Sequence, residues 1–248
     1  MTNGAVVAGR RAVVEAIRAG RVREVLIASG VRATQGLRAV EAAAAATGVD
    51  VRVIDRHQLD QMATGHQGVI ARLRHDDVPQ TELGERDLAL FPYTGDALVV
   101  VLDGITDPQN LGAAARTAEA AGAAVLVTRV RRSADLTPAA IRASAGALLH
   151  LPHARVANIA RALGRLQDSG FSVVGLADDA DGSIFDDPCP KGRVAIVIGS
   201  EGEGMSRLVR ERCDVLVRLP MQGRVGSLNA SASLAAALYG YVLPSRTS

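Results

Sequence analysis

Cysteine, tryptophan and lysine are scarce or absent in this sequence of 248 residues, and each absence narrows the class of protein. The two cysteines, Cys189 and Cys213, cannot form a disulfide framework. Together with five scattered histidines they offer no zinc-ligand spacing, so we expect no metal. Aromatic residues make up 2% of the chain, so base stacking on an RNA would depend on few rings or on arginine planes.

Long apolar runs are also missing. No stretch of about 18 residues is apolar and uncharged, which argues against a transmembrane helix. Arg10 and Arg11 lie where a signal peptide would need its apolar segment, so we expect a cytoplasmic protein without a membrane partner. Hydrophobic residues still make up 48% of the chain, which is enough for a sizeable core and excludes wholesale disorder.

Positive charge is carried almost entirely by arginine, because Lys191 is the only lysine among 28 basic residues. The net charge of the basic and acidic side chains is +5 in residues 1–75, −5 in residues 76–96 and +2 in residues 97–248. Guanidinium groups suit bidentate phosphate contacts, so a basic first segment favours a nucleic acid partner. A coding bias towards arginine and alanine accounts for the composition equally well, and charge alone does not decide between the two.

Residues 1–75 are predicted to form a small α/β domain, and residues 76–96 a linker. The linker contains Pro79, Pro92 and acidic residues without a convincing period. The first helix has Val13, Val14 and Ile17 on one face. The elements expected in this domain are helices over 9–20, 34–47 and 57–63 and strands over 22–29, 49–55 and 68–73.

Residues 97–248 are predicted to form a second domain in which strands and helices alternate. That rhythm is typical of a mostly parallel sheet with helices on both faces. The expected strands cover 97–103, 123–128, 171–177 and 193–199. The expected helices cover 110–122, 138–145, 156–168 and 228–240.

Three polar, glycine-containing motifs follow strands of this domain, at the place where α/β sheets bind ligands. They are DGITDPQNLGAAART (103–117), GSEGEGMS (199–206) and LPMQGRVGSLNASAS (219–233). A purely structural interpretation assigns Asn110, Ser227 and Asn229 to helix caps and the glycines to tight turns. Arg116 resists that interpretation, because Glu119 is the one acid within a turn of it. The glycine motif matches neither G-x-G-x-x-G nor a Walker loop, which makes a generic nucleotide-binding protein a poor interpretation.

In this order and at these separations, the three motifs resemble the SpoU (TrmH) family of RNA 2′-O-methyltransferases of the SPOUT class, and most of all its bacterial 23S rRNA guanosine methyltransferases. The likeness covers residues 97–241. The segments GRRAVVEAI (9–17) and HQGVIA (66–71) resemble the family's small RNA-binding domain, which is similar to ribosomal protein L30. This resemblance implies that Arg10, Arg11 and Gln67 contact RNA.

The resemblance further implies a deep trefoil knot in the C-terminal domain that holds S-adenosylmethionine. The implied cofactor-binding residues are Gly199, Leu219, Met221, Ser227 and Leu228, which together offer an apolar slot and main-chain hydrogen bonds without an acidic partner for the ribose. The implied catalytic residues are Arg116, Asn110, Glu201 and Asn229. Arginine is a poor base, so Arg116 is expected to orient and polarise the ribose hydroxyl.

Two other functions stay open: a tRNA 2′-O-methyltransferase, and a non-catalytic RNA-binding protein of the same fold. We expect a homodimer through the knot region, since the final helix is apolar around much of its circumference. Leu234, Ala237 and Tyr241 are the interface residues expected on that helix.

Overall fold

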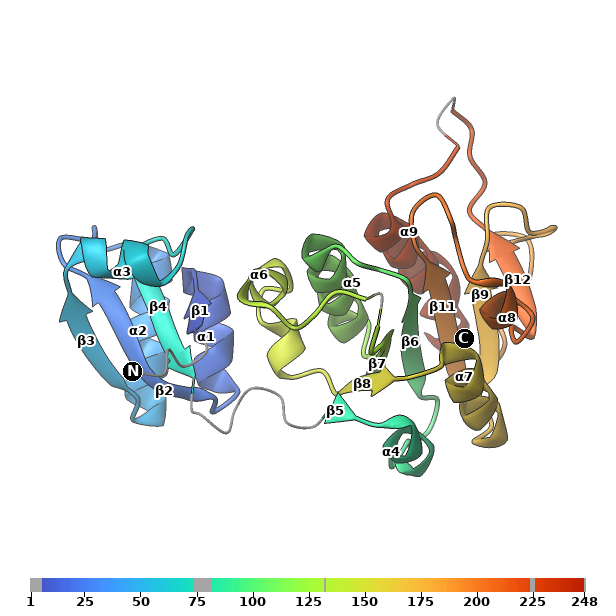
Figure 1. Cartoon of the computed structure of the whole chain (residues 1–248), viewed down its shortest axis with the longest axis horizontal. Coiled ribbons are helices and arrows are strands. Elements are labelled where there is room, and N and C mark those ends of the chain that lie inside the picture. The colour runs from blue at the N-terminus through green and yellow to red at the C-terminus, as the bar shows by residue number, and fades with distance from the viewer. Residues whose placement is uncertain (1–5, 74–81, 132, 224–225, 248) are drawn as a thin grey trace. The chain divides into compact units, whose positions relative to one another are not determined.

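The structure is a computed structural model that describes residues 6–73, 82–131, 133–223 and 226–247 (Figure 1). The chain forms two compact units. Unit 1 consists of residues 1–80 and 136–150, and unit 2 of residues 81–135 and 151–248. Residues 76–81 of the expected linker lie outside the described residues. The rest of the expected linker contains the short strand β5 (Glu82–Leu83) and the helix α4 (Glu85–Leu90), so it is not devoid of regular structure.

Unit 1 contains a four-stranded mixed sheet in the order β1-β4-β2-β3. Its strands are β1 (Val6–Ala8), β2 (Val22–Ala28), β3 (Asp50–Ile54) and β4 (Val69–Leu73), and its first helices are α1 (Arg10–Arg18), α2 (Gln35–Thr47) and α3 (Arg56–Met62). β2 and β3 run parallel, and β4 is antiparallel to β1 and β2. Thr34 caps α2 by accepting a hydrogen bond from the Leu37 amide, and Gly48 ends it at φ +68°.

Residues 136–150 belong to unit 1, although the sequence placed them in the second domain. They form the helix α6 (Pro138–Ala143) and a 3₁₀ turn, η1 (Ala147–Leu149). Ile141 and Leu149 are buried in the core that α1 and α2 build on the first sheet. Gly146 lies at φ +95° and so close to α1 that a Cβ atom there would come within 2.6 Å of the Cβ of Glu15.

Unit 2 contains an eight-stranded sheet in which every strand pair is parallel. The order is β10-β12-β9-β11-β6-β7-β8-β5. Besides β5, the strands are β6 (Leu98–Asp103), β7 (Val125–Arg129), β8 (His153–Val156), β9 (Ser172–Leu176), β10 (Gly182–Ser183), β11 (Val194–Gly199) and β12 (Val215–Arg218). The expected parallel sheet is therefore confirmed, with β8, β10 and β12 as strands that the sequence pattern did not reveal, besides β5 in the expected linker.

Helices cover both faces of this sheet (Figure 1). One face carries α4, α7 (Ile159–Asp168) and α8 (Arg207–Arg210), and the other carries α5 (Pro108–Ala120) and α9 (Ala230–Ala237). Val99 and Val101 share a core with Leu163 of α7, while Val100 between them points to the opposite face. All four valine and leucine side chains are fully buried, and each contributes about 1.5–3 kcal/mol to folding.

The C-terminal segment departs from the single long helix expected over 228–240. α9 is followed directly by a π-helical turn, η2 (Leu238–Val242), and by the short helix α10 (Pro244–Thr247). In the part of the chain that the structure describes, no helix is both long and apolar enough to span a membrane.

A buried histidine links two strands of unit 2. His153 of β8 is 2% exposed, and its Nε2 lies 2.8 Å from the hydroxyl of Thr128 on β7. Burial, assisted by the positive charge of Arg155, lowers the pKa of His153 to about 4. The folded protein therefore holds this ring neutral at a pH where the unfolded chain protonates it.

The free energy of unfolding should fall as the pH is lowered from about 6.5 towards 4, because His153 binds a proton in the unfolded state and not in the folded state over this range. The contribution of this one ring is on the order of 3 kcal/mol at pH 4 and below. Urea unfolding between pH 4 and pH 8 measures it. In His153→Gln this component of the pH dependence should vanish, whereas His57→Gln, which replaces an exposed ring, should keep it. An unchanged slope in His153→Gln would contradict the assignment.

Candidate active site

Three strands of unit 2 end at the positions where the sequence motifs begin. β6 ends at Asp103 and its neighbour β11 at Gly199, while β12 ends at Arg218 beyond β9. Because all of these strands run parallel, their carboxyl ends lie along one edge of the sheet. The loops that follow β6, β11 and β12 therefore meet at that edge.

The loop after β11 is fastened at both of its ends. Ser200 and Gly204 exchange two backbone hydrogen bonds of 3.2 and 2.9 Å, which fold residues 200–204 into a tight turn. The amide of Ser206 then donates to Oδ2 of Asp103 over 2.8 Å, and Asp103 is 3% exposed. Asp103 thus attaches the glycine loop to the end of β6. Asp103 is part of the first sequence motif, but the sequence analysis assigned it no role.

Gly199 is required by the loop itself. A Cβ atom at this position would lie 2.0 Å from the carbonyl carbon of Gly204 and 2.2 Å from the amide nitrogen of Met205. These are backbone atoms of the turn, so the loop would have to move to admit any side chain. The close approach at Gly199 is therefore made by the protein's own backbone.

Asn110, Glu201 and Asn229 come together from three separate motifs. Nδ2 of Asn110 donates to Oε1 of Glu201 over 2.8 Å, and Nδ2 of Asn229 donates to the same oxygen over 2.6 Å. Asn229 also donates to Oδ1 of Asn110 over 2.9 Å. The three side chains, 91 and 28 residues apart in sequence, form one closed polar cluster, which we call the amide–carboxylate cluster.

The structural interpretation as helix caps holds for Asn229 and is wrong for Asn110. Asn229 caps α9, and its Oδ1 accepts the amide of Ser231 over 3.0 Å. α5 instead begins at Pro108 with Asp107 as its cap, so the amide of Asn110 is free to reach Glu201. Asp107 does the capping that the sequence had assigned to Asn110.

Arg116 does not join this cluster. Its side chain is exposed on α5, and the described part of the chain offers it no hydrogen bond or ion pair. Six helical residues separate Asn110 from Arg116, which corresponds to about 9 Å along the axis and about 120° around it. The structure therefore brings together three of the four expected catalytic residues and leaves the guanidinium free.

A cavity of about 410 Å³ lies beside Glu201, within the size range of small-molecule sites. Gly199, Leu219, Ser227 and Leu228 line it, as the sequence led us to expect, whereas Met221 does not. The described lining also includes four carboxylates, of which only that of Glu201 was among the expected site residues. They belong to Asp178, Asp179, Glu201 and Glu203.

One of these carboxylates is paired. A hydrogen bond from Arg210, 2.6 Å long, lowers the pKa of Asp179 below its usual value. The carboxylates favour a ligand that carries positive charge, and Leu219, Leu228 and Ile198 provide apolar walls. The cavity thus fits a ligand with both cationic and apolar parts.

Unit 1 holds a hollow of its own, of about 560 Å³. Arg10 and Gln67 line it, together with Arg32 and Arg56, which sequence reasoning did not single out. Nη1 of Arg10 donates to the hydroxyl of Thr34 over 2.6 Å, which fixes the guanidinium beside α2. Gln67 adopts φ +51°, a conformation that few residues other than glycine take up. Arg11 is exposed on α1 but does not line the hollow.

This geometry defines an α/β protein with a ligand cavity at the carboxyl edge of a parallel sheet, and comparison with known proteins identifies its class. Residues 97–239 match the SpoU rRNA Methylase family, and residues 6–77 match the RNA 2′-O ribose methyltransferase substrate binding domain. The chain belongs to the SpoU rRNA methylase family.

Relatives extend over most of the chain. The 23S rRNA (guanosine-2′-O-)-methyltransferase RlmB of Photobacterium profundum is 42% identical over 195 residues, which cover 77% of this chain and 78% of that protein. RlmB of Salmonella typhimurium is 39% identical over 222 residues, 88% and 89% of the two chains. The SpoU methyltransferase AviRb of Streptomyces viridochromogenes, solved in complex with AdoMet, is 26% identical with a TM-score of 0.77, covering 98% of this chain and 91% of that one.

Gly199→Ala should destabilise unit 2 by about 1–3 kcal/mol, because the added methyl group forces the turn at Gly204 and Met205 apart. Differential scanning calorimetry of the whole protein measures the change. Gly223→Ala is the matched control, since a Cβ atom there meets nothing within 4 Å. Equal unfolding temperatures for the two variants would show that the loop does not depend on this approach.

Proposed function

We propose that this protein transfers a methyl group from S-adenosylmethionine to the ribose 2′-hydroxyl of a guanosine in 23S rRNA. The observation that carries the proposal is the amide–carboxylate cluster, which lies against the cavity lined by Gly199, Leu219 and Leu228. The names of the RlmB relatives support the choice of 23S rRNA and of guanosine.

The cavity suits S-adenosylmethionine in its chemistry. When bound, this molecule supplies a methyl group activated by the positive sulfonium. Leu219 and Leu228 would enclose the apolar part of the molecule, and main-chain groups near Gly199 would offer hydrogen bonds. Ser227 would contact the methionine carboxylate, and carboxylates such as Glu201 would balance the positive charge. AviRb, with the same fold, was solved with AdoMet, which supports this assignment.

A ribose hydroxyl is a weak nucleophile until its proton is removed or strongly polarised. We assign that polarisation to Arg116, whose exposed guanidinium has no partner among the described residues and can bind the hydroxyl and the adjacent phosphate. Asn110, Glu201 and Asn229 would position the ribose, since their shared hydrogen bonds hold all three side chains in place.

Methylation of unmodified 23S rRNA, 16S rRNA and tRNA by the purified protein tests the proposal, with 2′-O-methylguanosine identified by mass spectrometry. We expect product in 23S rRNA alone. Arg116→Gln should lower kcat about 100-fold while S-adenosylmethionine affinity, measured by calorimetry, stays unchanged. Glu119→Gln, an exposed change on the same helix, is the control and should keep full activity. Product in tRNA alone, or no product at all, would overturn the assignment.

The trefoil knot expected from the resemblance is part of this proposal. β12 lies at the far side of β9 and β11 from β6, yet α9 packs against α5, which follows β6. The chain therefore crosses from β12, on one side of β9, to α9, which packs against α5 and β11. We propose that the crossing segment and the loop of residues 199–206 together form a trefoil knot. The knot would enclose the S-adenosylmethionine cavity.

We also propose that residues 6–73 bind the RNA. Arg10, Arg32 and Arg56 line one hollow together with Gln67, and guanidinium groups suit phosphate contacts. The match of residues 6–77 to a substrate-binding domain supports the same role. Arg11 would add a contact from the exposed side of α1.

We also propose a homodimer that forms through the C-terminal helices. Its interface would consist of other residues than the sequence led us to expect. Leu234, Ala237 and Tyr241 are buried inside unit 2 and are not available to a partner. Tyr239 of η2 is 52% exposed, and Phe185, which is 68% exposed, lies near the neighbouring Gly240, so the surface around η2 presents exposed aromatic side chains.

Sedimentation equilibrium at micromolar concentration should give a dimer for the unaltered protein. Tyr239→Glu should weaken association at least about tenfold, because it places a charge in the proposed contact. Leu90→Glu, which alters an exposed leucine on α4, should leave the dimer intact. An unaltered protein that is monomeric and fully active would refute the dimer without affecting the proposed reaction.

A further inference from the structure

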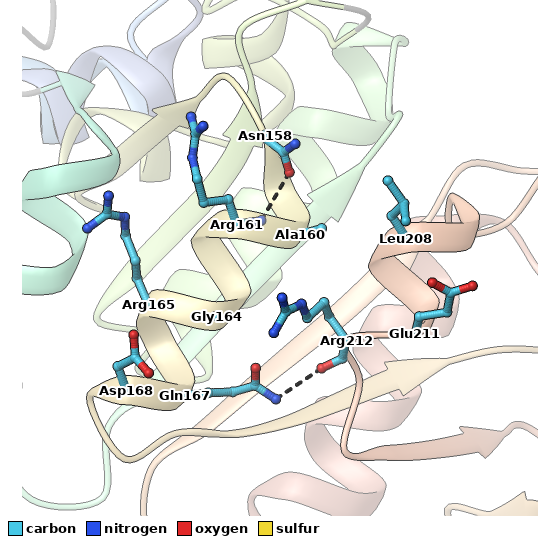
Figure 2. Close-up of a pocket in the computed structure, with 10 residues that line it drawn as sticks. All are labelled: Asn158, Ala160, Arg161, Gly164, Arg165, Gln167, Asp168, Leu208, Glu211 and Arg212. Atoms are coloured by element: carbon cyan, nitrogen blue, oxygen red, sulfur yellow. Dashed lines mark hydrogen bonds between the residues drawn. The ribbon is translucent and has the colours of Figure 1, made fainter.

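A second hollow of unit 2, of about 810 Å³, lies between α7 and α8 (Figure 2). Arg161 and Arg165 of α7 are among its lining residues, although their guanidinium groups turn away from Arg212, which projects towards α7 from the residues after α8. The side-chain amide Nε2 of Gln167 donates to the backbone carbonyl of Arg212 over 3.1 Å and so fixes the backbone of Arg212 at the wall of the hollow. None of these residues lines the cavity beside Glu201.

This hollow continues towards the edge of the sheet that carries the candidate active site. An adjoining hollow of about 290 Å³ shares Asn158, Ala160 and Leu208 with it and adds Arg129, Ser206 and Arg207. Ser206 is the residue whose amide is bonded to Asp103 at the end of β6. We call the two hollows together the arginine groove.

Arginine dominates the charge of the arginine groove. Five arginines line it, against the two carboxylates of Asp168 and Glu211, and two of the five, Arg161 and Arg165, are bonded to Glu85 of α4. Arg207 is paired with Glu211 at 2.5 Å. The guanidinium groups of Arg129 and Arg212 make no hydrogen bond or ion pair within the described ranges of the chain, so both are available to a ligand.

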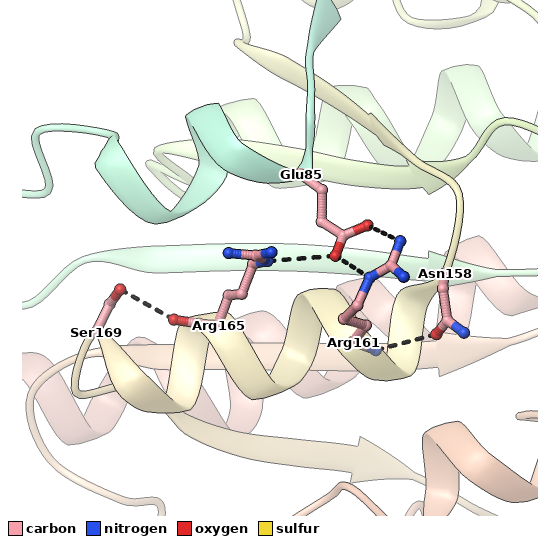
Figure 3. A network of polar contacts seen from close by, with 5 residues as sticks. All are labelled: Glu85, Asn158, Arg161, Arg165 and Ser169. Carbon is pink, nitrogen blue, oxygen red and sulfur yellow. Dashed lines mark hydrogen bonds and ion pairs between the residues drawn. The ribbon is translucent and has the colours of Figure 1, made fainter.

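Glu85 of α4 holds the two arginines of α7 in place (Figure 3). It accepts two hydrogen bonds from Arg161, one of them from Nη2 at 2.7 Å, and one from Nε of Arg165 at 3.2 Å. The hydrogen bonds from Arg161 lower the pKa of Glu85, so the carboxylate stays ionised at neutral pH. Nη1 and Nη2 of Arg165 form no bond to the described residues and remain as donors in a guanidinium already oriented by Glu85.

We propose that the arginine groove binds the sugar–phosphate backbone of the RNA strand that adjoins the methylated nucleotide. The inference rests on the proposed function and adds a contact surface to it. Guanidinium groups match phosphate, and the groove reaches the sheet edge at which the target ribose would lie. Leu208 is the only large exposed hydrophobic side chain of its described lining, so the groove lacks the apolar anchors that a peptide partner would need.

The test uses the full-length protein with unmodified 23S rRNA transcript, and measures affinity by filter binding at several salt concentrations. Arg212→Glu should weaken binding about tenfold and reduce the slope of log K against log salt by about 1. Arg165→Gln, a milder change that leaves both Arg161 bonds to Glu85 in place, should act in the same direction. Lys191→Glu is the control, because this exposed residue lies before β11 at the opposite edge of the sheet.

Calorimetry with S-adenosylmethionine separates this inference from the proposed function. Arg212→Glu should bind S-adenosylmethionine like the unaltered protein and should methylate rRNA at a raised KM with an unchanged kcat at saturation. If both groove variants keep full RNA affinity and an unchanged salt slope, the proposal that the arginine groove binds RNA is wrong. This holds even if the unaltered protein methylates 23S rRNA. Loss of methylation on ribosomal particles, with unchanged affinity for naked rRNA, would assign the groove to a protein partner instead.

Discussion

The hydrogen bond from the Ser206 amide to the buried carboxylate of Asp103 is the contact on which the carboxyl edge of unit 2 depends. It joins the glycine loop after β11 to the end of the neighbouring strand β6. The turn between Ser200 and Gly204 then directs Glu201 towards α5 and α9. The attachment thus supports the loop in which one oxygen of Glu201 accepts from the side-chain amides of Asn110 on α5 and Asn229 at the start of α9.

The same edge explains what sequence reasoning could reach. Buried parallel strands have near-continuous apolar sequences, and LVVVLD and VAIVIG were found for that reason. The motifs after them lie at that edge, and the family resemblance that they carry implied Asn110, Glu201 and Asn229, which the structure joins by hydrogen bonds. Asp103 was overlooked because a carboxylate at a strand end reads like any other loop residue until its backbone partner, 103 residues away, is known.

Other features had no signal in the local pattern. β10 is two residues long, and β8 carries a histidine and an arginine, so neither has the apolar alternation of a strand. Glu85 lay in a stretch interpreted as a linker, because its importance comes from two arginines of α7 that are 76 and 80 residues distant. The apolar character of the last helix was seen correctly, but a single sequence could not tell a face buried within unit 2 from a face that awaits a partner.

The assignment of residues 136–150 to unit 1 has a consequence for how such a protein can be recombined. The chain passes between the units three times, near residues 80, 135 and 150, instead of once. Unit 1 is therefore not a segment that a single splice can exchange. A foreign module grafted at residue 80 would have to accept Ile141 and Leu149 into its own core, so the first unit and this inserted segment are expected to evolve as one piece.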